Sequence, residues 1–437
     1  MGHYLPSTEG QQQEMLRAVG LATLDDLYAA APAALRLADG PDIPPGKSEL
    51  EVRRAFEAMA AKNTVYPTIF RGAGAYRHYI PSIVSAVTGK ETFLTAYTPY
   101  QAEISQGILQ SIFEYQTMIC ELTGMDASNA SVYDGASAAA EAVAMCRERK
   151  RTKTLVSAAA NPDVIETIKT YCWAAGTEVA LVPEKDGATD LAALQALLAD
   201  DVACVYVQQP NFYGIIEDGA ALCGAAHAAG AKAVMGVNPI AAAVLKTPGE
   251  CGADIAVGEG QPLGMPLAFG GPYLGFMACT AAMTRKLPGR IVGQTTDAAG
   301  RRAFVLTLQA REQHIRREKA SSNVCSNQAL CAMTAAVYMA AMGPDGLQKA
   351  AHQCAAKAHY LAAELEKIGF TRVHGGAFFH EFATTCPVDA AALEKKLGEN
   401  GILGGLTLED GNILWCATEL NTRAEMDRLV ALAKEVG

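Results

Sequence analysis

The sequence of 437 residues predicts an α/β protein with a mainly parallel sheet, an N-terminal helical arm and a small C-terminal α+β domain. Short apolar strand patterns alternate with helix patterns between residues 153 and 279, which is typical of βαβ units. Pro32 and the run from Pro41 to Gly46 interrupt the helix patterns near the N-terminus. We therefore expect an arm over 1–62, a large domain over 63–344 and a small domain over 345–437.

Composition and charge exclude several classes of function. Hydrophobic residues make up 50% and charged residues 19%, as in a compact globular protein. The net charge of −10 disfavours nucleic acid, which binds through neutralised phosphates. No apolar run approaches the roughly 20 residues of a membrane span, and the first residues lack a signal-peptide pattern. We expect a cytoplasmic protein that contacts neither nucleic acid nor membrane.

The spacing of the cysteines in the sequence argues against a metal site. The twelve cysteines are scattered singly, without a C-x-x-C pair or a Cys/His cluster. In a chain of this size they are typical of small buried side chains in a reducing compartment. The sequence therefore predicts no metal.

The arm is expected to contain capped helices. Ser7 or Thr8 can cap a first helix, and Ser48 followed by Glu51 matches a capping box before a second. A segment of this kind seldom forms a core of its own, so we expect it to cover a neighbouring surface.

Residues 66–106 are rich in Gly, Tyr, Pro and Thr and precede a helix pattern that runs from Ile104 to Leu122. Loops of this composition often serve a function, and their tyrosines could offer hydroxyl groups to a pocket. The alternative is a packed surface loop in which tyrosine fills space. The sequence leaves both interpretations open.

Small residues open the helix that follows Asp134, and this arrangement also has two interpretations. The free N–H groups of a helix N-terminus can hold an anion. Alternatively, Asp134 is an ordinary N-cap and the alanines allow close packing. The basic residues of 311–319 likewise fit either an acidic partner or a solvated charged face.

The predicted strands end in polar or small residues at three places: Gln208–Asn211, Asn238–Pro239 and Gly258–Gly264. Ligands of a parallel sheet gather at the carboxyl ends of its strands, so a pocket is expected there. The sequence contains no HExxH, GxSxG, Walker A or GxGxxG motif.

Several stretches together make the chain resemble one protein family over nearly its whole length. They are Y-L-P-S-T-E, Y-P-T-I-F-R-G-A-G-A-Y-R-H-Y-I-P, A-Y-T-P-Y-Q-A-E-I-S-Q-G, Y-D-G-A-S-A-A-A-E-A, G-E-G-Q-P-L-G, F-G-G-P-Y-L-G, P-G-R-I-V-G-Q-T-T-D, R-E-Q-H-I-R-R-E-K-A-S-S-N and L-W-C-A-T-E-L-N-T. The family is that of the P proteins of the glycine cleavage system, decarboxylating glycine dehydrogenases, in the form whose activity is split over two chains. The sequence resembles the alpha chain, subunit 1.

The resemblance implies a fold and a cofactor. The fold is that of the pyridoxal-phosphate (PLP)-dependent transferases, the aspartate aminotransferase fold type I. In such enzymes a lysine forms a Schiff base with PLP, whereas the corresponding position here is Gln261, whose carboxamide cannot form an imine. Asn238 stands where an aspartate is usual. The large domain is therefore expected to lack a functional PLP site.

The resemblance also implies a heteromeric enzyme of two alpha and two beta chains. PLP is bound to a lysine of beta (subunit 2). The enzyme decarboxylates glycine, releases CO2 and transfers the aminomethyl group to the lipoyl group of the H protein. No catalytic residue is expected on this chain alone. Tyr97, Thr98 and Tyr100 are expected to reach the glycine pocket of the partner, with Arg77 and His78 as weaker candidates.

Two alternatives remain at the level of sequence. The chain could be a stand-alone PLP lyase or transferase homodimer that uses another lysine, such as Lys246 or Lys286, although both lie in Pro/Gly turns. It could also be a non-catalytic docking subunit for the lipoylated H protein.

Overall fold

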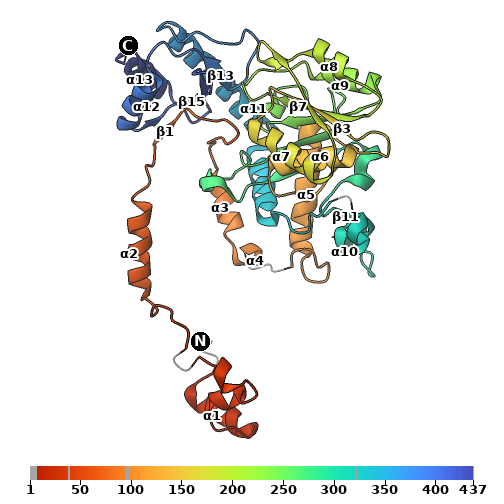
Figure 1. Cartoon of the computed structure of the whole chain (residues 1–437), viewed down its shortest axis with the longest axis vertical. Helices are drawn as coiled ribbons and strands as arrows, with labels where there is room; N and C mark the ends of the chain where they lie inside the picture. The colour runs from red at the N-terminus through yellow and green to blue at the C-terminus, as the bar shows by residue number, and fades with distance from the viewer. Residues whose placement is uncertain (1–6, 38–39, 95–97, 321, 437) are drawn as a thin grey trace. The chain divides into compact units, whose positions relative to one another are not determined.

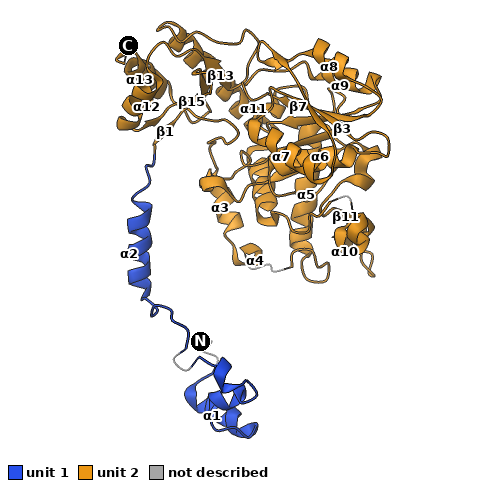
Figure 2. Ribbon diagram, in the orientation of Figure 1, with its two compact units in different colours: residues 1–65 blue, residues 66–437 orange. Residues whose placement is uncertain are grey.

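The structure, a computed structural model, describes residues 7–37, 40–94, 98–320 and 322–436. It divides into two compact units, residues 1–65 and residues 66–437 (Figure 2). Each unit is described by itself.

The first unit consists of short helices with capped N-termini. They are α1 (Glu9–Ala18), η1 (Leu24–Tyr28), η2 (Ala33–Leu35) and α2 (Glu49–Ala60). Thr8 caps α1, and Ser48 caps α2 in a capping box with Glu51, as the sequence predicts. In the described part of this unit α2 has no buried residue. Its Val52, Phe56 and Met59, spaced for one helix face, are 40%, 66% and 59% exposed.

A seven-stranded sheet forms the centre of the second unit (Figure 1), with the strand order β2-β10-β9-β8-β7-β3-β4. Its members are β2 (Ala127–Ser128), β3 (Lys153–Ser157), β4 (Val179–Val182), β7 (Val202–Gln209), β8 (Lys232–Val237), β9 (Ile255–Glu259) and β10 (Gly275–Cys279). The five strands from β9 to β4 are parallel, which confirms the predicted sheet. β10, next to the edge strand β2, runs antiparallel to both its neighbours.

Two apolar cores cover the two faces of this sheet. On one face α6 (Gly135–Cys146) and α7 (Pro162–Ala174) pack on alternate strand residues such as Tyr206. On the other face α5 (Gln106–Thr123), α8 (Leu191–Leu197), α9 (Gly219–Ala228) and the first part of α11 (Ala329–Glu366) pack on residues such as Val205. Period-two alternation along β7 thus sends neighbouring side chains to opposite cores.

The C-terminal residues build a third core on a small antiparallel sheet of β13 (Glu381–Thr384), β16 (Ile413–Cys416) and β15 (Leu406–Thr407). Trp415 is fully buried in this core, beneath α12 (Ala390–Glu399) and α13 (Arg423–Lys434). β1 (Thr68–Ile69) pairs with β14 (Ile402–Leu403), so the first residues of the unit join its last part. α11 is interrupted at Gly343, whose φ of 61° and ψ of 177° are non-helical, directly before Pro344, so two helices meet there.

The remaining elements are short. They are α3 (Ser82–Thr88), α4 (Glu91–Leu94), β5 (Glu184–Lys185), β6 (Ala188–Thr189), η3 (Ala241–Ala243), η4 (Ala268–Gly270), η5 (Ala281–Lys286), β11 (Val292–Thr296), β12 (Arg302–Leu306), η6 (Gln309–Arg311), α10 (Gln313–Arg316) and η7 (Arg317–Lys319). Among the described residues, no helix combines the length and the apolar character that crossing a membrane requires.

Candidate functional site

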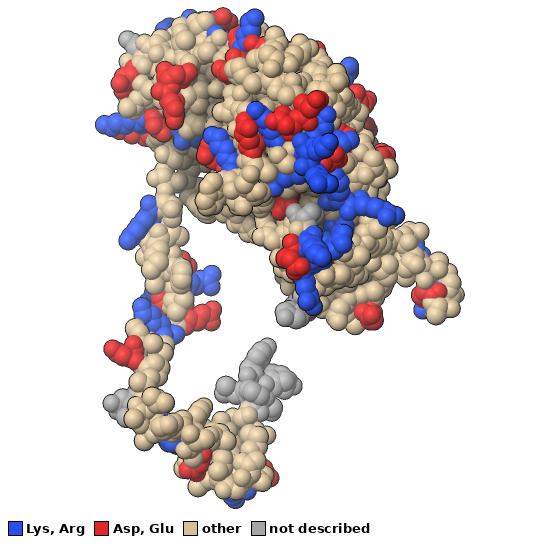
Figure 3. Space-filling model, turned by 45° about the vertical axis from the view of Figure 1, so that its right-hand side comes forward, with Lys and Arg blue, Asp and Glu red and all other residues tan. Residues whose placement is uncertain are grey.

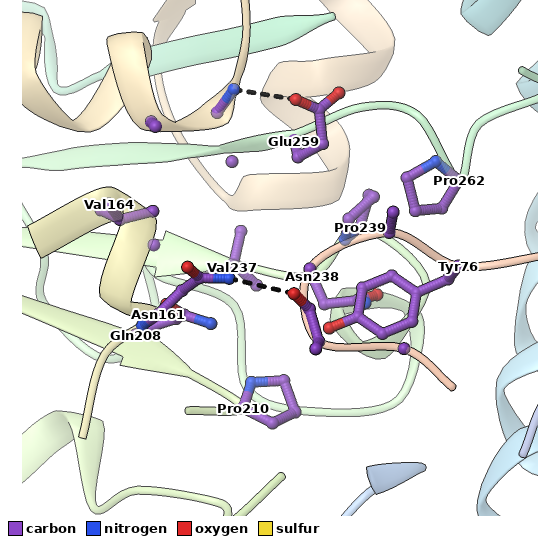
Figure 4. A pocket seen from close by; sticks show the side chains of 18 of the residues that line it. Tyr76, Asn161, Val164, Gln208, Pro210, Val237, Asn238, Pro239, Glu259 and Pro262 are labelled. Atoms are coloured by element: carbon purple, nitrogen blue, oxygen red, sulfur yellow. Dashed lines mark hydrogen bonds between the residues drawn. The ribbon is translucent and has the colours of Figure 1, made fainter. Parts of the chain in front are cut away.

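A cavity of about 330 Å³ lies where the sequence predicts a pocket, at the carboxyl ends of the parallel strands (Figure 4). Gln208 at the end of β7, Asn238 after β8 and Glu259 at the end of β9 all line it. The N-termini of α6 and α7 form further parts of the wall, and Glu381 of β13 contributes from the small sheet. The site therefore collects residues from the large sheet and from the C-terminal part.

Residues 72–76, here called the strap, run along one wall of this cavity. Ala73 has φ 58° and Gly74 has φ 113°, and a Cβ on Gly74 would lie 2.7 Å from Asn161 Nδ2. The positive φ of Gly74 and the close approach of the Asn161 side chain therefore favour glycine at this position. Glu381 Oε1 accepts a bond from Ala73 N at 2.6 Å, and Tyr76 Oη donates to Glu381 Oε2 at 2.7 Å.

Gln261 holds the strap from beneath and is fully buried. Its Oε1 accepts a bond from Tyr76 N at 2.9 Å, and its Nε2 donates to Tyr76 O at 2.9 Å and to Met265 O at 2.8 Å. Both ends of the carboxamide are thus used inside the protein. A lysine here could donate but could not accept the Tyr76 N–H.

The N-terminus of α6 is satisfied by carboxylates of the chain itself. Asp134 Oδ1 accepts a bond from Ser137 N at 2.8 Å, so Asp134 is an N-cap, as one of the two interpretations predicts. Glu259 Oε2 accepts a bond from Gly135 N at 2.9 Å, which Figure 4 shows. Glu259 Oε1 accepts from Gln261 N and Leu274 N, both at 2.9 Å. Negative side chains therefore occupy the position at which this helix end would hold an anion.

The cavity is acidic. Among the described residues that line it there is no lysine or arginine, whereas four carry carboxyl groups: Asp134, Asp163, Glu259 and Glu381. Burial raises the pKa of Glu381 to about 7, although the hydrogen bonds from Tyr76 and Ala73 oppose the rise. Burial also raises the pKa of Glu259. These residues do not fit PLP, because the cavity offers its phosphate no positive charge and its aldehyde no amine.

The other groups singled out in the sequence agree with this picture. Asn238 Oδ1 accepts bonds from Ile240 N and Ala241 N, while its buried Nδ2 has no partner in the described ranges. Within those ranges neither Lys246 nor Lys286 lines the cavity. Lys246 is exposed, and Lys286 Nζ lies 3.8 Å from Glu148 Oε1.

Comparison with known proteins identifies the family. A model of the family described as "Glycine cleavage system P-protein" matches residues 2–433. The chain belongs to this family.

Relatives of the P-protein family match the chain from end to end. A protein of Moorella thermoacetica named "Probable glycine dehydrogenase (decarboxylating) subunit 1" is 50% identical over 441 residues, covering 99% of each chain. A relative of the same name from Anoxybacillus flavithermus is 49% identical, covering 99% of this chain and 98% of the relative.

Solved structures also match the chain, one from the same family and one with the same fold at low sequence identity. A P-protein glycine decarboxylase crystallised in inhibitor-bound form matches with a TM-score of 0.93 and 43% identity, covering 100% of both chains. Sphingosine-1-phosphate lyase of Burkholderia pseudomallei has a TM-score of 0.66 at 14% identity, covering 94% of both chains, and so shares the fold alone. The predicted fold, that of the PLP-dependent transferases of fold type I, is confirmed.

Three of the predicted site residues belong to the loop before α5. Tyr97 lies outside the described residues. Thr98 is half-buried, and its Oγ1 donates to Gln101 Oε1 at 2.9 Å. The Tyr100 hydroxyl donates to Asn327 Oδ1, and the Arg290 guanidinium lies 5.2 Å from the centre of the Tyr100 ring. The Tyr100 hydroxyl is therefore engaged within the chain.

The two weaker candidates, Arg77 and His78, point in different directions. Arg77 is exposed, and its Nη1 donates to Pro67 O at 2.7 Å. His78 is buried, and its Nδ1 lies 2.8 Å from Glu419 Oε2. The structure thus places His78 inside the protein rather than on the surface of a loop.

The basic residues of 311–319 are divided between two roles. Arg311 donates to the carbonyl groups of Leu287 and Gly289 and is partly buried. Arg316 and Arg317 are exposed. Figure 3 shows Lys and Arg side chains in a band over one face of the second unit, although the net charge of the chain is −10.

Sequence reasoning missed Glu381, which lines the cavity, and covered Tyr76 and Glu259 only as members of the ranges 66–106 and 258–264. Glu259 stands two residues before Gln261, so its position next to the pocket was a usable signal. Glu381 lies 305 positions from its partner Tyr76, and no local pattern indicates that pair.

Proposed function

We propose that this chain is the cofactor-free subunit of a heteromeric glycine dehydrogenase of the glycine cleavage system. With a PLP-bearing partner, subunit 2, it decarboxylates glycine, releases CO2 and supplies the aminomethyl group to the lipoyl group of the H protein. The observation that carries the proposal is the fully bonded carboxamide of Gln261 at the position where PLP enzymes of this fold need a lysine.

The acidic cavity supports the same assignment. A chain that bound PLP itself would need donors for the phosphate at the N-terminus of α6, where Glu259 and Asp134 already accept the N–H groups. Two independent features, the missing amine and the occupied helix end, therefore favour a partner that carries the cofactor. In this proposal the chain supplies shape and side chains to the partner's site.

The exposed face of α2 is the part of the chain proposed to bind subunit 2. Val52, Phe56 and Met59 form an apolar stripe that no residue of the described first unit buries. An apolar stripe of this kind is usually covered in an assembly. The assembly proposed is a heterotetramer with two chains of each kind.

The loop residues Tyr97, Thr98 and Tyr100 are proposed to reach the glycine pocket of the partner. Arg77 is a weaker candidate: it is exposed, and its Nη1 donates to Pro67 O. His78 can act on that pocket only as a positioning residue, because its ring is buried against Glu419 and Glu419 Oε1 accepts a bond from the backbone of Tyr79.

The decisive experiment measures exchange between the glycine carboxyl group and labelled bicarbonate, with this chain alone, subunit 2 alone, and both together. Exchange is expected only for the mixture, with a borohydride-stable pyridoxyl label only on subunit 2. A label on Lys246 or Lys286 with exchange by this chain alone would support the homodimeric PLP enzyme instead. Binding of lipoylated H protein by this chain without subunit 2, with full exchange by subunit 2 alone, would support the docking subunit.

The proposal places the chain in the cytoplasm. All twelve cysteines are unpaired, which fits a reducing compartment.

A further inference from the structure

Three side chains that are far apart in the sequence meet behind the strap. His78 follows the strap, Cys354 lies on α11, and Glu419 follows β16. His78 Nδ1 lies 2.8 Å from Glu419 Oε2, and Cys354 Sγ lies 3.3 Å from the same oxygen. The three ligand atoms are all within 4.8 Å of one another. None of the three residues lines the cavity described above.

Glu419 Oε2 thus accepts hydrogen bonds from both His78 Nδ1 and Cys354 Sγ. The side chains of His78 and Glu419 are 2% and 14% exposed, and Cys354 is fully buried. Burial alone would raise the pKa of Glu419, but the hydrogen bond and charge of His78 lower it to about 2. Burial and the neighbouring carboxylate raise the pKa of the Cys354 thiol. The cluster therefore holds an anionic oxygen, a thiol and an imidazole around one point.

The surroundings contain polar atoms that the protein does not satisfy. Among the described residues His78 Nε2, Tyr338 Oη and both ring nitrogens of His380 have no hydrogen-bond partner. His380 is 1% exposed, and its ring centre lies 4.6 Å from that of Tyr76, which in turn is 6.5 Å from that of His78. Buried polar groups without partners are rare in folded proteins and indicate that something else is bound or exchanged nearby.

We propose that His78 Nδ1, Cys354 Sγ and Glu419 Oε2 form a binding site for one zinc-class divalent ion. Nitrogen, thiolate sulfur and carboxylate oxygen are the ligand types that Zn²⁺ takes. Metal–ligand bonds of about 2.0–2.3 Å in a tetrahedron place ligand atoms roughly 3.3–3.7 Å apart. The 2.8 Å pair of His78 and Glu419 would open by about half an ångström, and the third pair, which lies within 4.8 Å, would close by at most about 1.5 Å. A water molecule completes the fourth position.

The protons balance without a further reactant. Binding breaks the S–H bond of Cys354 and the Nδ1–H bond of His78, and forms the metal–thiolate and metal–imidazole bonds. The thiol proton leaves to solvent. A neutral imidazole keeps its one proton by moving it to Nε2, and a charged imidazole releases the Nδ1 proton to solvent and keeps the one on Nε2. Because Nε2 has no partner in the described chain, nothing on that side of the ring opposes this tautomer.

The ion would fasten three parts of the fold at one point. His78 belongs to the segment that continues the strap, Cys354 lies near the middle of α11, and Glu419 follows the last strand of the small sheet. Thr418 Oγ1 already donates to Arg77 O at 2.8 Å, so the segments are in contact before any ion binds. This inference does not depend on the proposed enzymatic function, because it concerns only this chain.

The test uses the full chain stripped of metal and titrated with Co²⁺ and then with Zn²⁺. We expect one equivalent of Co²⁺ to produce a thiolate-to-cobalt charge-transfer band in the near ultraviolet, and one equivalent of Zn²⁺ to abolish it. Release of one proton from Cys354 per ion is expected in weakly buffered solution, with a second from His78 in molecules whose imidazole is charged before binding. C354A should lose the band, and E419Q should weaken Co²⁺ binding by at least about 100-fold, as loss of a direct ligand requires.

The matched control is C223A, which removes another buried cysteine on α9, outside the cluster, and should keep the band. Circular dichroism shows which variants fold. If C354A does not fold, E419Q replaces it as the test variant. A folded wild-type chain that takes up less than about a tenth of an equivalent of either ion, or a band that survives in C354A, would overturn the proposal.

Discussion

The carboxamide of Gln261 bonds both backbone groups of Tyr76: Oε1 accepts its N–H and Nε2 donates to its carbonyl oxygen, each at 2.9 Å. One side chain therefore pairs with a strap residue as a neighbouring β-strand would. The position that we propose to correspond to the Schiff-base lysine of PLP enzymes of this fold holds here a structural clamp.

Replacing that clamp with lysine is expected to destabilise the chain without creating a PLP site. Gln261→Lys leaves Tyr76 N without an acceptor and buries an ammonium group, so the free energy of unfolding should fall by about 2–4 kcal/mol. Added PLP should give no borohydride-stable label on residue 261. The measurements are urea unfolding and mass spectrometry of the reduced protein.

The matched control for this change is Gln348→Lys, at an exposed position on α11. It should change the unfolding free energy by less than about 0.5 kcal/mol. A labelled, stable Gln261→Lys chain would show that the pocket still accepts the cofactor.

The carboxyl group of Glu381 should make stability depend on pH between about 4.5 and 7. Burial raises the pKa of Glu381 to about 7 in the folded protein, above the ordinary glutamate value of 4.5. The folded state therefore binds more protons than the unfolded state in this window, and stability falls as pH rises through it. The total loss is roughly 3 kcal/mol, reached above pH 7.

Glu381→Gln tests this dependence by removing the titration. Urea unfolding of both proteins at a series of pH values gives the difference in unfolding free energy. The wild type should lose stability relative to the variant as pH rises from 5 to 7.5. Parallel curves for the two proteins would contradict the raised pKa of this group.

Removal of the Glu259 side chain should open the N-terminus of α6 to an anion. Glu259→Ala leaves the N–H groups of Gly135, Gln261 and Leu274 without their acceptor, at a cost of about 3–5 kcal/mol of unfolding free energy. Inorganic phosphate should raise the melting temperature of this variant and not that of the wild type. The control is Glu121→Ala, an exposed residue of α5. Equal phosphate effects on all three proteins would refute the idea that Glu259 occupies an anion position.

The apolar stripe of α2 should contribute to binding of subunit 2. Phe56→Ser removes the central side chain of the stripe and is expected to weaken the complex by about 10-fold or more, through lost apolar burial. Sedimentation of the mixed subunits measures this. Arg54→Ser changes the opposite face of the same helix and should leave the complex intact. Equal affinities of the two variants for subunit 2 would show that the apolar stripe of α2 does not contribute to the interface.

Removal of the Tyr100 hydroxyl group distinguishes a structural role of this residue from a role in the partner's site. Tyr100→Phe leaves Asn327 Oδ1 without its donor, so a loss of about 1–2 kcal/mol in stability of the isolated chain is expected. If the loop also reaches the glycine pocket, exchange by the reconstituted complex should fall by more than about 10-fold at full complex formation. Tyr360→Phe removes a hydroxyl that bonds Asp427 on α13 and serves as the control. Reduced stability with normal exchange would restrict Tyr100 to a structural role.

Local patterns were sufficient for the elements that depend on neighbouring residues. The capping box of Ser48 follows from sequence spacing, as do the N-caps Thr8 and Asp134, each one of two possibilities at that level, because the interacting groups are a few positions apart. The parallel strands β3, β4, β7, β8 and β9 follow from the alternation of strand and helix patterns. The antiparallel direction of β10 could not be predicted this way. It depends on the path of the chain after Gln261, which the strand pattern does not encode.

The sequence by itself determined the fold class, the place of the pocket at the strand ends and the absence of a lysine at position 261. Only the tertiary structure decided what replaces it: Tyr76, Glu259 and Glu381 close around that pocket, and His78, Cys354 and Glu419 meet behind it. The physical reason is that covalent identity and short-range periodicity are written along the chain, whereas burial and contacts between distant segments exist only once the segments pack.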